Sequence, residues 1–221
     1  MRFGGLLHVW TPWQHGAMQL ARFFRNPFVR RTPLDSANLG PGVRDLVLRV
    51  MEDADVPFCL DLYRANEAEH FPGGYFDQYE GQLCAGDFLN LVAVRDREPV
   101  GCVGLMSDAN GDVWLCFAMV APSHQRNGVG TALLLTSLAL LTPVHGWSTM
   151  RLTAVPGSVR FYRRFGFLFA PASADHKGVI HSTACLDLRA AEIDACRAVL
   201  AERRITYPNV RDQIPRAAPT G

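Results

Sequence analysis

The stretch WLCFAMVAPSHQRNGVGT, residues 114–131, decides the fold of this chain. Its first half is a run of apolar and aromatic residues, which predicts a buried strand. Pro122 has no N–H and ends the strand pairing, and Gly128 and Gly130 let the backbone turn and come close to a ligand. The second half predicts a helix that begins at these glycines. The first N–H groups of a helix have no partners there and, with the positive end of the helix dipole, they form an anion site for a phosphate group.

Two stretches resemble the signatures of one enzyme family. QRNGVG, residues 125–130, matches the (Gln/Arg)-x-x-Gly-x-(Gly/Ala) pattern of the GNAT superfamily of acyl-CoA-dependent N-acetyltransferases. It carries neither the Gly-x-Gly-x-x-Gly of dinucleotide-binding proteins nor the Gly-Lys-Ser/Thr of a P-loop. FYRRFGF, residues 161–167, is similar to the family's second signature, an aromatic residue and a tyrosine followed by basic residues and Gly-Phe. One predicted helix and one predicted strand separate the two stretches, as in the family.

The composition of the chain argues against several classes of function. The 221 residues are 48% hydrophobic and 19% charged, which is ordinary for a soluble globular protein, and the net charge of +1 argues against a polyanion-binding protein. No apolar run approaches the roughly 18 residues that cross a membrane. The six cysteines are dispersed and are expected to be reduced, buried groups in a cytoplasmic protein. Histidines, cysteines and carboxylates show no metal-site spacing, so no metal is expected.

The chain divides into three predicted parts: a basic N-terminal extension at residues 1–43, a GNAT domain at 44–188, and a C-terminal helix and tail at 189–221. Up to Pro33 the extension carries five arginines and no acidic residue. A docked or flexible arm is the favoured interpretation, ahead of an organelle transit segment or an arm that touches nucleic acid or a membrane surface.

Hydrophobic patterns and turn residues predict the order of the elements. The first strand (46–51) leads into a helix that Asp53 or Asp55 caps and that runs to about residue 68. On the last strand, Val179, His181, Thr183 and Cys185 share one face by period two. The other expected elements are a hairpin (88–94 and 99–106), the central strand, the glycine helix ended by Pro143 and Gly146, a strand (150–155), a short helix (159–165), a closing hairpin (168–171 and 179–186) and an amphipathic helix (190–204).

The family resemblance implies a fold and a cofactor site. The fold is mixed α/β, with a central, mostly antiparallel sheet that splays between strands 4 and 5 and is flanked by helices. Acyl-CoA lies in that opening. By resemblance, the acetyl-CoA-binding residues are Met119 and Val120 at the pantetheine, Gln125, Arg126, Asn127, Gly128, Val129, Gly130 and Thr131 at the pyrophosphate, and Ser158 at the start of the short helix.

The catalytic residues are only partly implied. Tyr162 occupies the position of the family's usual general acid, where its phenol would protonate the sulfur of CoA. Many members place a glutamate base where this chain has Trp114, and an asparagine where it has Val155. Asp112 has the same strand parity as Trp114 and is expected to substitute as the base. Other candidate bases are Glu67, Glu69, His70, Glu80 and His124. Trp114 and Phe117 are expected to supply an apolar lining near the acceptor.

The leading hypothesis is an N-acetyltransferase that moves an acetyl group from acetyl-CoA to a primary amine by direct attack in a ternary complex. The acceptor is a small molecule or a peptide, and the protein is a monomer or a homodimer. The alternative, favoured by the missing glutamate, is a non-catalytic acyl-CoA-binding regulatory module on the same fold. Binding to nucleic acid through the basic arm is a third and weaker hypothesis, and no membrane partner is expected.

Overall fold

A computed structural model describes residues 42–71, 74–108, 110–141, 147–189 and 191–215. The predicted N-terminal extension lies outside the described residues, except for its last two positions. Pro143 and Gly146, which were expected to end the glycine helix, also lie outside them.

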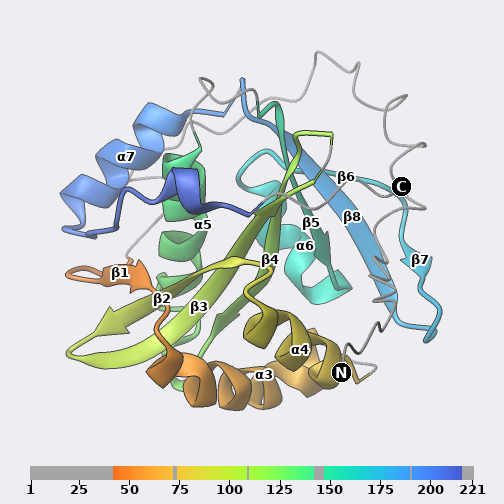
Figure 1. Ribbon diagram of the computed structural model, residues 1–221. Coiled ribbons are helices and arrows are strands. Elements are labelled where there is room, and N and C mark those ends of the chain that lie inside the picture. The colour runs from red at the N-terminus through yellow and green to blue at the C-terminus, as the bar shows by residue number, and fades with distance from the viewer. Residues whose placement is uncertain (1–41, 72–73, 109, 142–146, 190, 216–221) are drawn as a thin grey trace, which may run out of the picture.

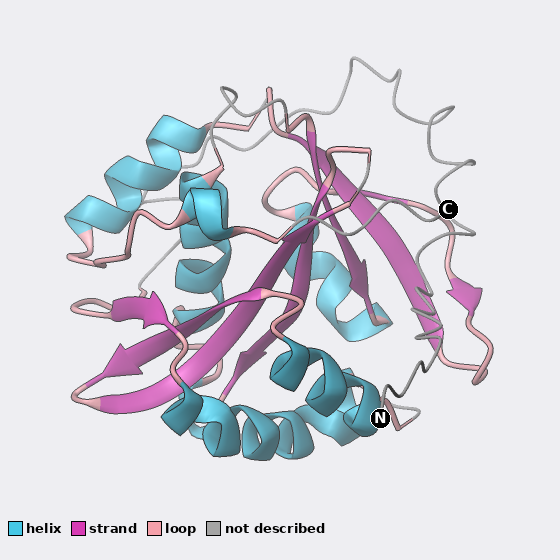
Figure 2. Ribbon diagram, in the orientation of Figure 1, coloured by secondary structure: helices cyan, strands magenta, loops and turns pink. Residues whose placement is uncertain are grey.

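The core of the protein is one eight-stranded sheet (Figures 1 and 2). The strands follow the order β1-β2-β3-β4-β5-β8-β6, and β7 pairs with β8 off this path. Neighbouring strands are antiparallel, except that β4 and β5 are parallel. The strands are β1 (Val47–Val50), β2 (Leu89–Arg95), β3 (Glu98–Ser107), β4 (Val113–Val120), β5 (Thr149–Ala154), β6 (Leu168–Phe169), β7 (Ser173–Ala174) and β8 (Ile180–Asp187).

Helices cover both faces of this sheet (Figure 1). The helices α3 (Val56–His70) and α4 (Phe76–Ala85) pack on one face, around buried Cys59, Tyr63 and Tyr79. On the other face lie α5 (Val129–Leu140), α6 (Pro156–Arg163) and α7 (Ile193–Glu202). Three short 3-10 turns complete the described part: η1 (Asp53–Asp55), η2 (Pro122–His124) and η4 (Arg211–Gln213).

The predicted fold class is confirmed, with small differences at element ends. The expected short helix begins three residues early because Pro156, with its fixed φ, occupies the first helical turn. The first arm of the expected closing hairpin divides into β6 and β7, which both pair with β8. The C-terminal helix α7 packs on α5, and its Cys196, Val199 and Leu200 join the core cluster of the sheet. This part of the chain therefore shares the core of the central domain.

The feature that opens the sheet is the short pairing of β4 with β5. The two strands pair only at Val113 with Met150 and at Trp114 with Arg151. Beyond this closed end, β4 continues to Val120 without a partner on the β5 side. Phe117 has φ 44°, and the register between β3 and β4 shifts there, which marks a β-bulge that bends β4 at the opening. The splay expected between the fourth and fifth strands is therefore present.

The carboxylate of Asp55 holds the start of α3 onto β1. It accepts two hydrogen bonds from the guanidinium of Arg49, at 2.6 and 2.7 Å, and one from the backbone N–H of Glu52 at 2.8 Å. The hydrogen bonds from Arg49 lower the pKa of Asp55, against the opposing effect of burial. A carboxyl group whose pKa is lowered in the folded state stabilises the fold above its unfolded pKa and loses this effect as the pH falls.

The substitution Asp55→Asn is expected to lower the free energy of unfolding by about 1–2 kcal/mol at pH 7, because it removes a charged acceptor shared by three donors. The difference from wild type is expected to shrink as the pH falls below about 4, where the unfolded aspartate is protonated. Urea denaturation at pH 7 and pH 3 measures both effects. Asp61→Asn is the control: Asp61 pairs with Arg64 on the surface, and its loss should change stability by less than about 0.5 kcal/mol. Equal differences for Asp55→Asn at both pH values would contradict the linkage.

Candidate active site

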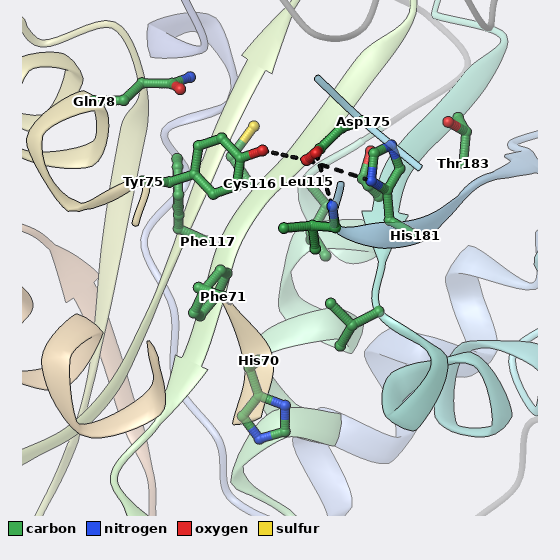
Figure 3. A pocket seen from close by; sticks show the side chains of 13 residues that line it. His70, Phe71, Tyr75, Gln78, Leu115, Cys116, Phe117, Asp175, His181 and Thr183 are labelled. Atoms are coloured by element: carbon green, nitrogen blue, oxygen red, sulfur yellow. Dashed lines mark hydrogen bonds and ion pairs between the residues drawn. The ribbon is translucent and has the colours of Figure 1, made fainter. Parts of the chain in front are cut away.

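A cavity of about 140 Å³ lies where β4 and β5 have parted. Its walls come from the unpaired part of β4, the ends of β5 and α3, the start of α4, and β8 with the turn before it (Figure 3). Phe71, Leu115 and Phe117 make much of the lining apolar. Tyr75, Asp175 and His181 are its polar side, and among the described residues that line the cavity Asp175 carries the one formal negative charge. The cavity therefore combines a flat apolar wall with a localised anionic group.

Asp175 is the centre of a polar network at this cavity. One carboxylate oxygen, Oδ1, accepts hydrogen bonds from the backbone N–H groups of Lys177 (2.8 Å) and Val179 (3.0 Å). The other, Oδ2, accepts a hydrogen bond from the hydroxyl of Tyr75 and lies 3.8 Å from Nδ1 of His181 (Figure 3). The Asp175 side chain is only 8% exposed. The network joins the start of α4 to β8 across the opening of the sheet.

Burial and hydrogen bonds set the charge of this network. Burial raises the pKa of Asp175, but the hydrogen bonds from Tyr75 and from two backbone N–H groups outweigh it, so the net pKa is lowered. Burial, and then the hydrogen bond to Asp175, raise the pKa of Tyr75 above its usual value. Asp175 is therefore a carboxylate and Tyr75 a neutral phenol at neutral pH.

A threonine on β5 adds an unused polar group to the cavity. The hydroxyl of Thr153 is shielded from solvent and has no hydrogen-bond partner among the described residues. Thr153 pairs across the sheet with Thr183, which also lines the cavity. A buried hydroxyl without a partner is unfavourable, so a bound ligand with a polar atom would stabilise this position.

The predicted phosphate-binding loop has the geometry of an anion site. Gly128, with φ 90°, is the N-cap of α5, and no side chain caps this helix. The first backbone N–H bonded inside the helix is that of Ala132, which donates to the carbonyl of Gly128. The N–H groups of Val129, Gly130 and Thr131 therefore have no partner within the helix. Arg126 and Asn127 are exposed beside them, and Arg126 adopts a left-handed backbone with φ 59°.

Gln125 has a different contact from the other loop residues. Its side-chain amide donates to Oδ1 of Asn66 at 3.0 Å and to the carbonyl oxygen of Val120 at 3.3 Å. Asn66 donates to the same carbonyl at 3.2 Å. These bonds tie the loop to α3 and occupy the carbonyl of Val120, one of the backbone groups expected to meet pantetheine. Met119, the other, is buried in β4.

The second signature forms α6, directly after β5. The ring of Tyr162 packs edge-on against Phe161 and Phe167, with centroids 4.9 and 5.6 Å away. Burial raises the pKa of Tyr162 to about 12, so the phenol keeps its proton at neutral pH. Ser158 lies half-buried in the first turn of α6, and its N–H donates to the carbonyl of Val155.

Asp112 is not brought to the cavity. It lies at the closed end of β4 and β5, where its carboxylate pairs with the guanidinium of Arg151. Both side chains are largely buried, at 11% and 15% exposure. Cys116, which does line the cavity, is four residues farther along the strand, about 13 Å away. This position disfavours the role of base that strand parity predicted for Asp112.

Only some of the other predicted residues line the cavity. His70 and Phe117 line the cavity, and Trp114 packs elsewhere, against Phe88 and Cys116. The described lining excludes Glu67, Glu69, Glu80 and His124.

Sequence reasoning did not single out Tyr75, Asp175 or His181 as functional residues. For His181, a signal was present. The period-two face of the last strand, which was predicted to carry Val179, His181 and Thr183 together, is the face that lines the cavity. Tyr75 and Asp175 are 100 positions apart in the chain, and no local pattern relates them.

The described part of the chain holds neither a metal site nor a membrane-spanning helix. No group of three or more histidine, cysteine or acidic residues there has the arrangement of a metal site. Likewise, none of the described helices is both long and apolar enough to span a bilayer.

Comparison with known proteins agrees with the two signatures. The sequence profile of the acetyltransferase (GNAT) domain matches residues 59–183. Among solved structures, the Escherichia coli ribosomal-protein-S18-alanine N-acetyltransferase is similar, with a TM-score of 0.52 and 18% identity over 65% of this chain and 94% of that chain. The spermidine N-acetyltransferase of Vibrio cholerae, solved in complex with CoA and spermine, gives a TM-score of 0.53 and 18% identity over 65% and 96%. A search of curated protein sequences gives no significant match.

The profile covers more than half of the chain, and the fold is that of the acetyltransferase structures. The chain belongs to the GNAT family of acetyltransferases. Acetyl transfer is thus the general class of its reaction.

A matched pair of glycines tests the loop geometry. At Gly128 an added Cβ would lie 2.8 Å from both Cα of Gly42 and N of Val43, and φ is left-handed. Gly128→Ala is therefore expected to lower the free energy of unfolding by about 1–3 kcal/mol. At Gly130 the nearest atom is Cγ2 of Val120 at 3.7 Å, so Gly130→Ala should be neutral or stabilise the helix by up to about 1 kcal/mol. Urea denaturation measures both. Similar stability for the two variants would contradict the packing of residues 42 and 43 on this turn.

Proposed function

We propose that the protein is an N-acetyltransferase that moves an acetyl group from acetyl-CoA to a primary amine by direct attack in a ternary complex. The observation that carries this proposal is the joint position of two sites at the opening of the sheet. The free N–H groups of Val129, Gly130 and Thr131 suit a pyrophosphate, and a cavity with one carboxylate lies between the parted strands.

The residues present fit acetyl-CoA. The exposed side chains of Arg126 and Asn127 add donors next to the free N–H groups of α5. The unpaired edge of β4 offers backbone groups of the kind that bind the pantetheine amides. Acetyl-CoA supplies the thioester. In this arrangement the loop binds the phosphates and β4 orients the acyl arm, while Gln125 holds the loop against α3.

The acceptor is a small primary amine with an apolar body, or a peptide that inserts one residue. Phe71, Phe117 and Leu115 supply apolar contact, and Asp175 makes the cavity favourable for a cation. A cavity of about 140 Å³ is close to the size that admits a benzene ring. A single carboxylate matches one ammonium group better than the several of a polyamine.

Tyr162 is the proposed general acid. A departing thiolate needs a proton, and a phenol that remains neutral at neutral pH is able to donate one. The raised pKa also keeps Tyr162 in its donor form over the whole pH range in which amines react.

The alternative function is a non-catalytic acyl-CoA-binding regulatory module. The absence of a glutamate at Trp114 and the distant position of Asp112 favour this reading over catalysis. The network around Asp175 favours catalysis, because it places titratable groups at the cavity. Under either function, the six free cysteines support a reducing, cytoplasmic location. The protein acts as a monomer or a homodimer.

Gly130→Asp tests the phosphate site. Its Cβ has room, and an acidic residue in the first turn of a helix is favourable for the helix, so the fold should be retained. The new carboxylate would repel the pyrophosphate, and CoA affinity measured by calorimetry should fall at least about tenfold. Gly130→Ala, which adds no charge, is the control and should bind CoA within about twofold of wild type. Unchanged binding in Gly130→Asp would place the phosphates elsewhere.

Tyr162→Phe tests catalysis. Thiol release from acetyl-CoA is measured with 2-phenylethylamine, spermine and an alanine-first peptide, and turnover should fall about 100-fold while CoA affinity is retained. Because burial raises the pKa of Tyr162 to about 12, wild-type kcat should show no loss between pH 8 and 10 from ionisation of this phenol. CoA binding without release for every acceptor would favour the regulatory module. A basic limb near pH 10 that vanishes in Tyr162→Phe would contradict the raised pKa of this phenol.

A further inference from the structure

The cavity is lined by several titratable groups, and the proposed general acid Tyr162 is not one of them. A primary amine is protonated at neutral pH and becomes a nucleophile only after it loses a proton, so the reaction needs a base beside the acceptor. The titratable residues that line the cavity are Asp175, Tyr75, Cys116, His70 and His181.

Asp175 is a poor base because its lone pairs are already used. Its two oxygens accept hydrogen bonds from Tyr75, Lys177 and Val179, and the remaining acceptor direction faces His181. A carboxylate offers about four acceptor sites, so little capacity is left for a ligand. Its lowered pKa also weakens it as a proton acceptor. Asp175 is therefore a positioning group.

Tyr75 and Cys116 are excluded as the base because both keep their own protons at neutral pH. Both groups accept a proton only after they have lost one. Burial raises the pKa of Cys116 to about 12, and the hydroxyl of the half-buried Tyr75 donates its proton in a hydrogen bond to Asp175. The two histidines remain, and a neutral imidazole is the side chain that accepts a proton most readily near neutral pH.

The partners of the two histidines differ. Nδ1 of His181 lies 3.8 Å from a carboxylate that is 8% exposed, and His181 itself is 18% exposed. Nε2 of His70 lies 3.9 Å from Glu69, whose side chain is 78% exposed. An exposed carboxylate is screened by water and stabilises a neighbouring cation only weakly, whereas a buried one does so strongly. Of the two histidines, His181 is therefore the one that has a buried carboxylate beside it.

We propose that His181, oriented by Asp175 and Tyr75, is the general base that takes the proton from the amine acceptor. This inference rests on the proposed function and assigns its missing base. With Nδ1 turned toward Asp175 and protonated, Nε2 is the nitrogen that carries the free lone pair. The carboxylate then stabilises the imidazolium that forms, and Tyr75 fixes the carboxylate.

The proton and electron pairs balance in this scheme. His181 Nε2 takes one proton from the ammonium, and the freed nitrogen lone pair forms the C–N bond to the thioester carbon. The C–S bond then breaks, and Tyr162 gives its proton to the sulfur and regains one from the former amine nitrogen. The imidazolium releases its proton to solvent. Ammonium and acetyl-CoA thus give the acetamide, CoA thiol and one proton.

The charged and titratable groups around His181 come from several elements. Lys177 is bound to other groups: its Nζ donates to the carbonyl of Gly74 at 2.6 Å and lies 4.1 Å from the Tyr75 ring. His176 lies on the same turn, outside the cavity lining, with its ring 6.2 Å from that of Tyr75. The titratable groups that line the cavity with His181 are Asp175 of the turn, Tyr75 before α4, His70 of α3 and Cys116 of β4.

The test is the pH profile of kcat/KM for the full chain, measured with the amine of the three-member panel that wild type acetylates fastest. Wild-type kcat/KM is expected to fall toward low pH along an acidic limb, because a protonated base cannot accept the proton of the amine. His181→Gln should lower kcat/KM about 100-fold at pH 7, with CoA affinity unchanged. Its residual activity should rise about tenfold per pH unit up to about pH 9, because solution chemistry then supplies the free amine. Asp175→Asn should lower kcat about tenfold at pH 7 with CoA affinity unchanged, and should have no further effect in His181→Gln, because Asp175 acts by orienting the imidazole.

Two histidine variants serve as comparisons. His176→Gln alters an exposed imidazole on the same turn, outside the cavity lining, and should keep the acidic limb and activity within about twofold of wild type. His70→Gln changes the second histidine of the cavity and should also keep the acidic limb. Urea denaturation and CoA calorimetry verify that each variant is folded.

The outcomes separate this inference from the function on which it rests. Wild type that binds no CoA, or binds it without turnover, overturns the proposed function and this inference together. Wild-type turnover with an acidic limb that keeps its wild-type midpoint in His181→Gln, or that is lost in His70→Gln, overturns the assignment of His181 alone. Replacement of that limb in His181→Gln by a rise that continues to about pH 9, together with an Asp175→Asn effect that disappears in His181→Gln, supports it.

Discussion

The parting of β4 and β5 is the constraint on which the rest of the structure depends. Two parallel strands in the middle of a sheet pair over two residues each and then separate, so the backbone groups beyond Trp114 need partners outside the β5 edge. Asp112 and Arg151 hold the closed end together with a largely buried ion pair. The bulge at Phe117 bends β4 within its unpaired part, three residues beyond the last pair with β5. A structural ion pair, a bulge and an opening thus lie along one strand, and the opening holds the cavity.

Different elements around the opening supply the glycine turn and the polar side of the cavity. The glycine turn after β4 presents free N–H groups at one end, and Gln125 and Asn66 fix that turn to α3 through the carbonyl of Val120. The turn before β8 presents Asp175, and β8 itself presents His181, on the cavity side. These two turns belong to different parts of the sheet.

The local signals predicted the elements well. The apolar run ending at Val120, the proline after it and the glycines at 128 and 130 correspond to β4, η2 and the start of α5. These features depend on backbone geometry and burial within a few residues, which sequence patterns report directly. Asp112 shows the limit of the same reasoning. Strand parity predicts a catalytic base at this position, but the carboxylate of Asp112 forms an ion pair with Arg151, which is 39 positions away in the chain.

The sequence by itself determined the family, the order of most strands and helices, the glycine turn before α5 and the place of Tyr162 in α6, because each is encoded in contiguous residues. Only the tertiary structure decided the polar side of the acceptor cavity. Tyr75, Asp175 and His181 meet because the splayed sheet brings the start of α4 against the turn before β8. A hydrogen bond between residues 100 positions apart follows from how the whole sheet packs, and no local preference of either residue specifies it.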